Sequence, residues 1–377
     1  MENNKKIKIK KIFIEENIKS STYTKRILNR IETKEITIFD NINNLKKKCF
    51  GKFDPNDSVE TLILSTTKGE VLKKCPGSNG HICCNYFIIN LYIGCPINCS
   101  YCILQSYLNK SSIMINVDLD NIFYKLETIF NTNRDKFFRI GTGELGDSLY
   151  YDPLTDFSLD FIDFFSRHKN TIFEFKTKTN FVDNLFKVKP VSNIVVAFSL
   201  NPQNVIDKEE LNASSVEERL IAAKKLADYG YKIALHFDPV VLIDNFESEY
   251  GNLIKMLFSY INRESIVWIS IGTFRYTNEL KNIIEYNHPH SNLLYREFVL
   301  CKDNKYRYFK PIRLRLYKKI FSLLVEFGGE NIPIYLCMES VDIWREFGTK
   351  LLKASEGNRT LVSSLGSLCS TIELHSQ

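Results

Sequence analysis

The chain lacks the features that define several large protein classes. It contains no uninterrupted run of about 18 or more apolar residues, so we expect no membrane-spanning helix and no membrane partner. The N-terminal segment MENNKKIKIKKIFIEENIKSS has lysines but neither an apolar core nor a small-residue cleavage site, which argues against a signal peptide. There is also no phosphate-binding P-loop, no dinucleotide-binding glycine motif after a strand and no serine-hydrolase motif. These absences predict a cytoplasmic protein outside those enzyme classes.

A strong charge of one sign is also missing. The 50 basic and 44 acidic residues leave a net charge of +6 over 377 residues, which permits a nucleic-acid partner without requiring one. With 44% hydrophobic residues, the chain can bury a full core in one large domain with appendages or in two domains. In a reducing compartment, its ten cysteines are better explained as thiols or metal ligands than as disulfides.

Short apolar runs alternate with amphipathic stretches from about residue 85 onward. The clearest helix is Ser215–Tyr229, because Ser214 or Ser215 can cap its start and Gly230 can end it. Strands that alternate with helices indicate a parallel sheet, and six such units fit a partial (β/α)6 barrel. The predicted strands are Tyr86–Ile93, Phe137–Gly141, Ile172–Phe175, Ile194–Ser199, Lys232–Phe237 and Ile266–Ile271.

The segments on either side of this pattern differ from it. Residues 1–80 are highly charged, and we predict an irregular N-terminal extension before a barrel domain over residues 81–280. Residues 281–377 are predicted to form an α+β appendage. It would contain a hairpin from Tyr295–Leu300 and Lys305–Phe309, a helix near Ile312–Phe327 and a strand at Ile332–Leu336. The fold class predicted is therefore α/β with two additions.

Three cysteines form a compact C-x3-C-x2-C motif, Cys95-Pro-Ile-Asn-Cys99-Ser-Tyr-Cys102, directly after a predicted strand. Three thiolates can hold three corners of a 4Fe–4S cluster and leave the fourth iron open to a cofactor. The alternative is a zinc knuckle, which needs a fourth ligand. The candidates for that ligand are Cys75, His81, Cys83 and Cys84.

The region around this motif resembles the spore photoproduct lyase family of radical S-adenosylmethionine (SAM) enzymes. The aromatic residue before the last cysteine belongs to the radical SAM signature, and Ile103-Leu-Gln-Ser-Tyr-Leu108 is more specific to the lyases. The resemblance covers about residues 70–275. Further similar segments are Lys176-Thr-Lys178-Thr, Phe198-Ser-Leu-Asn201, Glu217-Glu-Arg219 and His236-Phe-Asp-Pro239.

The resemblance implies roles for individual residues. Cys95, Cys99 and Cys102 would bind the 4Fe–4S cluster, and Tyr101 would approach the adenine of SAM as the candidate catalytic residue. The remaining candidates would contact SAM from the ends of later strands, where active sites of (β/α) barrels lie. They are Thr142, Gly143, Glu144, Lys178, Ser199 and His236, with the Glu144 carboxylate expected on the methionyl amino group.

The reaction implied is repair of the spore photoproduct, a thymine dimer in DNA, by a 5′-deoxyadenosyl radical. A flavodoxin or ferredoxin would supply the electron. The lyases also carry a hydrogen-donating cysteine about forty residues past the cluster, and this chain has no cysteine between Cys102 and Cys301. Ile103 also replaces a second aromatic residue. Another donor, such as Cys301, Cys337 or a tyrosine, would have to act, or the substrate would have to differ.

Residues 296–319 carry nine lysines and arginines with aromatic residues among them. Basic groups attract phosphates and aromatic rings can separate bases, so Arg307 and Tyr308 are candidates for a wedge that enters damaged DNA. A solvated helix face with core aromatics explains the same pattern. Three functions therefore remain: a spore photoproduct lyase, a radical SAM enzyme with another substrate, and a zinc-stabilised nucleic-acid-binding protein.

Overall fold

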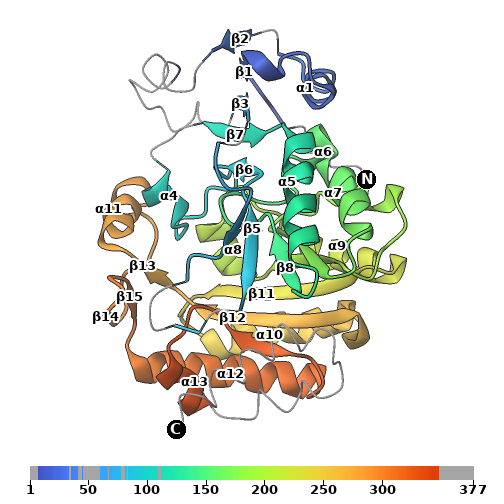
Figure 1. Cartoon of the computed structure of the whole chain (residues 1–377). Coiled ribbons are helices and arrows are strands. Elements are labelled where there is room, and N and C mark those ends of the chain that lie inside the picture. The colour runs from blue at the N-terminus through green and yellow to red at the C-terminus, as the bar shows by residue number, and fades with distance from the viewer. Residues whose placement is uncertain are drawn as a thin grey trace.

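The computed structural model describes residues 7–33, 35–40, 45, 60–66, 68–77, 81–82, 84–108 and 112–347. Its centre is a curled eight-stranded sheet with the order β16-β12-β11-β10-β9-β8-β5-β4 (Figure 1). Neighbouring strands from β5 to β16 are parallel, and β4 is antiparallel to β5. The strands are β4 (Leu72–Lys74), β5 (Tyr86–Ile89), β8 (Phe138–Gly141), β9 (Thr171–Thr177), β10 (Ile194–Ser199), β11 (Lys232–Val240), β12 (Ile266–Thr273) and β16 (Ile334–Leu336).

Helices cover the outer face of this sheet (Figure 1). The predicted caps of the helix before β11, α9 (Val216–Tyr229), are confirmed, because Ser215 and Glu218 form a capping box and Gly230 ends the helix with φ of 115°. The helices are α1 (Thr22–Leu28), α4 (Leu104–Tyr107), α5 (Leu119–Thr132), α6 (Asp152–Thr155), α7 (Phe157–Ser166), α8 (Gln203–Glu209), α9 (Val216–Tyr229), α10 (Phe246–Tyr260), α11 (Asn278–Asn287), α12 (Lys310–Gly328) and α13 (Val341–Phe347), with 3-10 turns η1 (Glu16–Ile18), η2 (Asp183–Lys187) and η3 (Arg263–Ser265).

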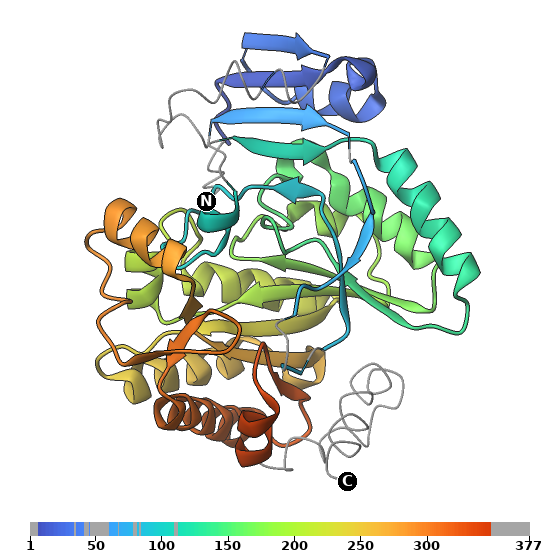
Figure 2. The same cartoon turned by 60° about the vertical axis from the view of Figure 1, so that its left-hand side comes forward.

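The prediction of an irregular N-terminal extension is wrong. A second, five-stranded sheet has the order β2-β1-β3-β7-β6 and lies at the end of the molecule opposite α12 (Figure 2). Its strands are β1 (Lys11–Glu15), β2 (Glu35–Phe39), β3 (Thr61–Ser65), β6 (Tyr92–Ile93) and β7 (Ile113–Asn116). The first three strands were not recognised as a sheet because β7, which completes their parallel pairing, comes from far along the chain.

The predicted strand Tyr86–Ile93 is two strands in different sheets. The Leu91 amide donates to the Ile89 carbonyl oxygen at 3.0 Å, and this tight turn separates β5 from β6. β5 joins the curled sheet, whereas β6 pairs antiparallel with β7. The cysteine motif therefore leaves the edge of the second sheet and lies between the two sheets.

The predicted hairpin and the long helix after it are confirmed. β14 (Phe298–Leu300) and β15 (Tyr306–Tyr308) pair antiparallel, and β13 (Arg275–Tyr276) extends them to a three-stranded sheet. β16 instead pairs with β12 and so belongs to the curled sheet. Strands from outside residues 81–280 thus border this sheet on both sides, and the predicted domain limits stay a prediction. Among the described residues, no helix is long and apolar enough to cross a bilayer.

Candidate functional site

The three motif cysteines lie on the loop between β6 and α4, with Cys99 buried and the other two partly buried. Burial raises the pKa of all three thiols, and the Lys178 ammonium opposes this at Cys99 and Cys102. Buried thiols lose their protons readily only when a positive centre compensates the charge. The loop thus suits thiolate ligands of an iron–sulfur cluster, whose positive irons would provide that compensation.

The zinc alternative needs several ligands around one ion. Within the described ranges, no three histidine, cysteine, aspartate or glutamate side chains are placed to hold a single metal ion. Cys83, one of the candidate fourth ligands, lies outside those ranges. Three cysteines that bind separate irons of a cubane do not have to meet at one ion.

The segment after α8 holds the cysteine loop in place. Cys99 forms an antiparallel bridge with Glu210, and the Ser100 amide donates to the Glu209 carbonyl oxygen at 2.9 Å. The Asn212 amide donates to the Ile97 carbonyl oxygen at 3.1 Å. Because these are backbone bonds on both sides of Cys99, the shape of the loop does not depend on a bound metal alone.

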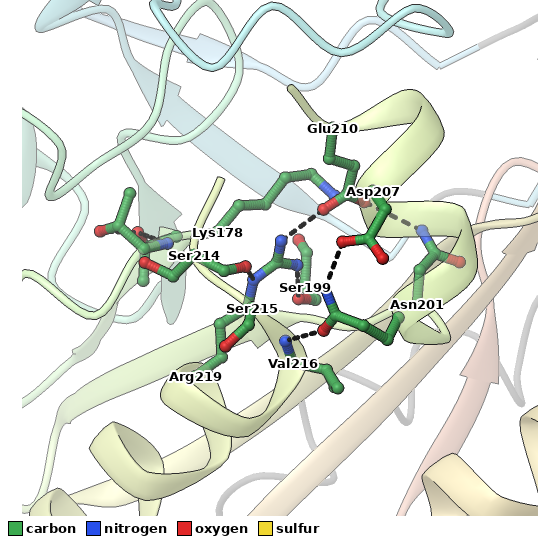
Figure 3. A network of polar contacts seen from close by, with 12 residues as sticks. Lys178, Ser199, Asn201, Asp207, Glu210, Ser214, Ser215, Val216 and Arg219 are labelled. Carbon is green, nitrogen blue, oxygen red and sulfur yellow. Dashed lines mark hydrogen bonds and ion pairs between the residues drawn. The ribbon is translucent and has the colours of Figure 1, made fainter. Parts of the chain in front are cut away.

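The Glu210 carboxylate is the centre of a buried polar network, part of which is drawn in Figure 3. Lys178 Nζ lies 2.9 Å from both Glu210 Oε1 and the Tyr101 hydroxyl, which itself donates to Glu210. Asn201 Nδ2 donates to Glu210 Oε1 at 3.0 Å, and Arg219 Nη2 donates to Oε2 at 2.5 Å. Burial raises the pKa of Glu210, but the two cations outweigh it and lower the pKa overall.

This network brings three predicted site residues together. Tyr101 and Lys178 are in direct contact, with the Lys178 ammonium 5.4 Å from the centre of the Tyr101 ring. Ser199 is buried at the end of β10, where its carbonyl oxygen accepts from Arg219 Nη1 at 2.8 Å. Sequence reasoning missed Glu210, for which no local pattern exists. Asn201 and Arg219 end two segments that resemble the lyase family, and this resemblance was the sequence signal available for those two residues.

The loop after β8 carries the predicted Thr142-Gly143-Glu144 motif. The Gly94 amide donates to the Leu145 carbonyl oxygen at 2.8 Å, so this loop contacts the start of the cysteine loop. Glu144 is half-buried, and burial raises its pKa against the opposing charges of Lys73 and Lys176. The buried Asp147 carboxylate, which was not predicted, accepts from the Lys178 amide at 2.8 Å and holds the loop against the end of β9.

His236 belongs to a second network, deeper in the curled sheet. Its Nε2 lies 2.5 Å from Glu174 Oε1, and its Nδ1 lies 2.6 Å from Ser270 Oγ. Arg139 Nη2 approaches the other Glu174 oxygen at 3.3 Å. Because protein groups occupy both ring nitrogens, the structure does not support the predicted direct contact between His236 and SAM.

The prediction that Arg307 and Tyr308 form a DNA wedge is wrong. Arg307 is 1% exposed and its guanidinium binds the Asp303 carboxylate at 2.6 and 2.8 Å. Tyr308 is 0% exposed, and its hydroxyl accepts from the Leu242 amide at 3.0 Å. The pairing with Asp303 allows the arginine to be buried. Exposed apolar side chains of the hairpin include Leu300 and Phe309, at 59% and 51%.

Comparison with known families gives one matching model, described as spore photoproduct lyase, over residues 10–317. A spore photoproduct lyase from Geobacillus sp. is 29% identical over 210 residues, or 55% of this chain and 62% of the relative. The enzyme of the same name from Bacillus subtilis is 26% identical over 55% of this chain and 61% of its own length. The aligned segments thus span about three fifths of these curated relatives.

Solved structures show the same fold. A spore photoproduct lyase variant with bound AdoMet and dinucleoside spore photoproduct superposes with a TM-score of 0.75 at 22% identity. That comparison covers 88% of this chain and 99% of the other. The curled α/β half-barrel is therefore shared along nearly the full length of the solved enzyme.

Proposed function

Because the chain belongs to the spore photoproduct lyase family, we propose that it is a radical SAM enzyme that repairs spore photoproduct in DNA. The observation that carries this proposal is the cysteine loop, which the Glu210 network holds beside Tyr101 and Lys178. Three thiols on a rigid, half-enclosed loop are suited to a cluster with one open iron. Relatives that bear the family name act on the same lesion, which gives the substrate class.

Each group of the site has a proposed task. Cys95, Cys99 and Cys102 would hold the 4Fe–4S cluster. When bound, the cluster and SAM would supply a 5′-deoxyadenosyl radical after reduction by a flavodoxin or ferredoxin. The Glu144 carboxylate would accept hydrogen bonds from the methionyl ammonium of SAM, because it is half-buried and forms no ion pair within the described residues.

Tyr101, Thr142, Gly143, Lys178 and Ser199 stay predicted SAM-site residues. The Lys178 ammonium already binds Glu210 and Tyr101, so its proposed task is to hold the Tyr101 ring in position rather than to contact SAM alone. The Thr142 hydroxyl donates to Ser148 Oγ at 2.9 Å, which shapes the loop that carries Glu144.

Cys337 is the better placed of the two cysteines considered as hydrogen donors. It directly follows β16, at the same end of the parallel sheet as Asp238, and its thiol is hydrogen-bonded to that carboxylate. Cys301 instead lies in the hairpin turn, with its sulfur 3.8 Å from the Val299 carbonyl oxygen. Cys337 would give one hydrogen atom to the product radical. One electron from the reductant and one proton would then restore the thiol.

The function can be tested under anaerobic conditions. We would reconstitute the cluster, add dithionite and SAM, and measure 5′-deoxyadenosine and the restored thymine pair in an oligonucleotide that carries spore photoproduct. Repair in D2O should place one solvent-derived deuterium in the product thymine, because thiol hydrogens exchange with water. Cys337→Ala should remove this deuterium, whereas Cys301→Ala should retain it.

A second candidate is a radical SAM enzyme of the same family with another substrate. The missing cysteine between Cys102 and Cys301 favours it. Formation of 5′-deoxyadenosine without restoration of the two thymines would support this candidate and contradict the repair reaction. Glu144→Ala should weaken SAM binding in either case and leave the visible absorbance of the cluster unchanged; an unchanged SAM affinity would remove Glu144 from the site.

A further inference from the structure

Three ionisable side chains occupy alternate positions at the end of β9: Glu174 and Lys176 lie within the strand, and Lys178 directly follows it. Alternate residues of a strand share a face and are spaced by roughly 6–7 Å. Glu174 is bound to His236 deep in the sheet, and Lys178 is bound to Glu210 beside the cysteine loop. Lys176 therefore lies one step further from the cysteine loop than Lys178, between the two polar networks.

The charge of Lys176 reaches acids on three different elements. It acts to lower the pKa of Glu144 in the loop after β8, of Glu174 on its own strand and of Asp238 on β11. It also acts on Cys102. The Lys176 side chain therefore lies near the loop after β8, strands β9 and β11, and the cysteine loop.

The position of the Lys176 side chain is constrained, yet its ammonium is uncommitted. The Lys176 amide donates to Ser148 Oγ at 3.0 Å, which fixes the backbone. A Cβ atom on Gly143 would lie 3.1 Å from Lys176 Cβ and 3.2 Å from its Cε, so the glycine leaves the room that this side chain occupies. No acid in the described part of the chain lies within ion-pairing distance of its ammonium, although the residue is half-buried.

The acids near Lys176 do not take up its charge at contact distance. Asp238 pairs with Arg275 at 3.1 Å, and Glu174 pairs with Arg139 and His236. A half-buried cation without a contact partner can donate to an oxyanion, and such a charge-assisted hydrogen bond is stronger than a neutral one. Such a group would lie at the carboxyl end of β9, next to the loop after β8 and to β11.

We propose that Lys176 binds the phosphodiester that links the two thymidine units of the lesion and thereby selects a DNA substrate. This inference rests on the proposed function. The thymine bases of the lesion are uncharged, so the phosphodiester is the oxyanion that it offers to a cation. The SAM carboxylate is the other available oxyanion, but it would be held at the open iron, on the Lys178 side of Lys176.

Equilibrium binding measurements distinguish the phosphodiester from the SAM carboxylate as the partner of Lys176, and they do not require turnover. We would measure Kd for SAM, for dinucleoside spore photoproduct without a phosphate, and for the dinucleotide with its phosphodiester, using the reconstituted protein. The wild type should bind the dinucleotide more tightly than the dinucleoside. Lys176→Met should weaken the dinucleotide about tenfold, as expected for one charge-assisted contact, and leave the other two ligands unchanged.

Two further variants make the test specific. Lys176→Arg retains the charge and should restore most of the preference for the dinucleotide. Lys232→Met removes a lysine at the exposed start of β11, at the opposite end of the sheet, and should change none of the three affinities. The preference of the wild type should also decrease with added salt, whereas Lys176→Met should show no such decrease.

The outcomes distinguish this inference from the proposed function. A wild type that binds both lesion forms equally, or a Lys176→Met variant that keeps the preference, would overturn the role of Lys176 alone. A variant that loses SAM affinity but keeps the preference would assign Lys176 to the cofactor carboxylate and also overturn it. A wild type that binds neither lesion would overturn the proposed substrate and this inference together.

Discussion

Two buried carboxylates organise the interior of the half-barrel, and they differ in how completely their surroundings are paired. Around Glu210, the Tyr101 hydroxyl, the Lys178 ammonium and the Arg219 guanidinium all have partners. Around Glu174, Arg139 Nε and Nη1 have no hydrogen-bond partner in the described residues. The nearby Tyr86 hydroxyl and Trp268 Nε1 have none there either.

The fully paired Glu210 network supports the cysteine loop in one geometry, whereas the Glu174 network still has donors that can bind a water or a ligand. A fully paired network stabilises one geometry, which suits the fixed cysteine loop. Unpaired buried donors are costly and are commonly satisfied by water or a ligand. The Glu174 network therefore retains donors that are unpaired within the described residues, and these lie near the amino ends of β5, β8 and β12, at the opposite end of the sheet from Lys176. The predictions below test this distinction, from the largest expected effect to the smallest.

Cys99→Ala should remove one ligand of the cluster and leave the Glu210 network intact. An iron corner loses its thiolate, so we expect no cluster absorbance and no SAM cleavage. The Glu210 network remains, so the far-ultraviolet circular dichroism of the variant should match that of the wild type. A variant that cleaves SAM at the wild-type rate would contradict the assignment of Cys99 as a ligand.

Glu210→Gln should disrupt the Glu210 network itself. Two cations, Lys178 and Arg219, would lose a buried charged partner, which costs about 3–5 kcal/mol of unfolding free energy. Urea unfolding measures this loss. Glu209→Gln is the matched control, since the neighbouring Glu209 carboxylate accepts from the Ser100 and Ser291 hydroxyls. Equal losses for the two variants would show that charge pairing is not what distinguishes the Glu210 network.

Glu174 should make stability depend on acid pH. Burial raises its pKa, but His236 and Arg139 outweigh this and lower the pKa from 4.5 to about 2. A lowered pKa in the folded state stabilises the protein above about pH 4.5, and this contribution decreases as the pH falls toward 2. The difference in unfolding free energy between wild type and Glu174→Gln should be about 3 kcal/mol at pH 6 and smaller at pH 3.5.

A difference that stays constant between pH 6 and pH 3.5 would contradict the lowered pKa of Glu174. Urea unfolding at each pH supplies both values, and Glu127→Gln, at a half-exposed carboxylate on α5, serves as the control for general acid effects.

Two tyrosine variants should show the smallest effects and compare the networks directly. Tyr101→Phe removes a hydroxyl that donates to Glu210 and accepts from Lys178, so we expect a loss of about 1–2 kcal/mol. Tyr86→Phe removes a hydroxyl without a partner among the described residues and should change stability by less than about 0.5 kcal/mol. Thermal unfolding of both variants measures the contrast. A large loss for Tyr86→Phe would reveal a bound water or ligand at this hydroxyl.

Local sequence patterns predicted much of the curled sheet. β10 has the predicted limits, β8, β9, β11 and β12 differ from theirs by a few residues, and the caps of α9 are as expected. These features depend on periodicity and capping within a short segment. The N-terminal sheet was missed because its strands pair with one another and with β7 across long stretches of chain.

The sequence by itself determined the chemical groups of the site, because a C-x3-C-x2-C spacing brings three thiols into one loop wherever the loop lies. Only the tertiary structure decided which side chains surround that loop. Glu210 meets Tyr101 and Lys178 from distant segments, and Arg307 is buried because Asp303 pairs with it. Whether a charge is solvated, paired or left to bind a ligand depends on its partners across the fold, and no local pattern encodes those partners.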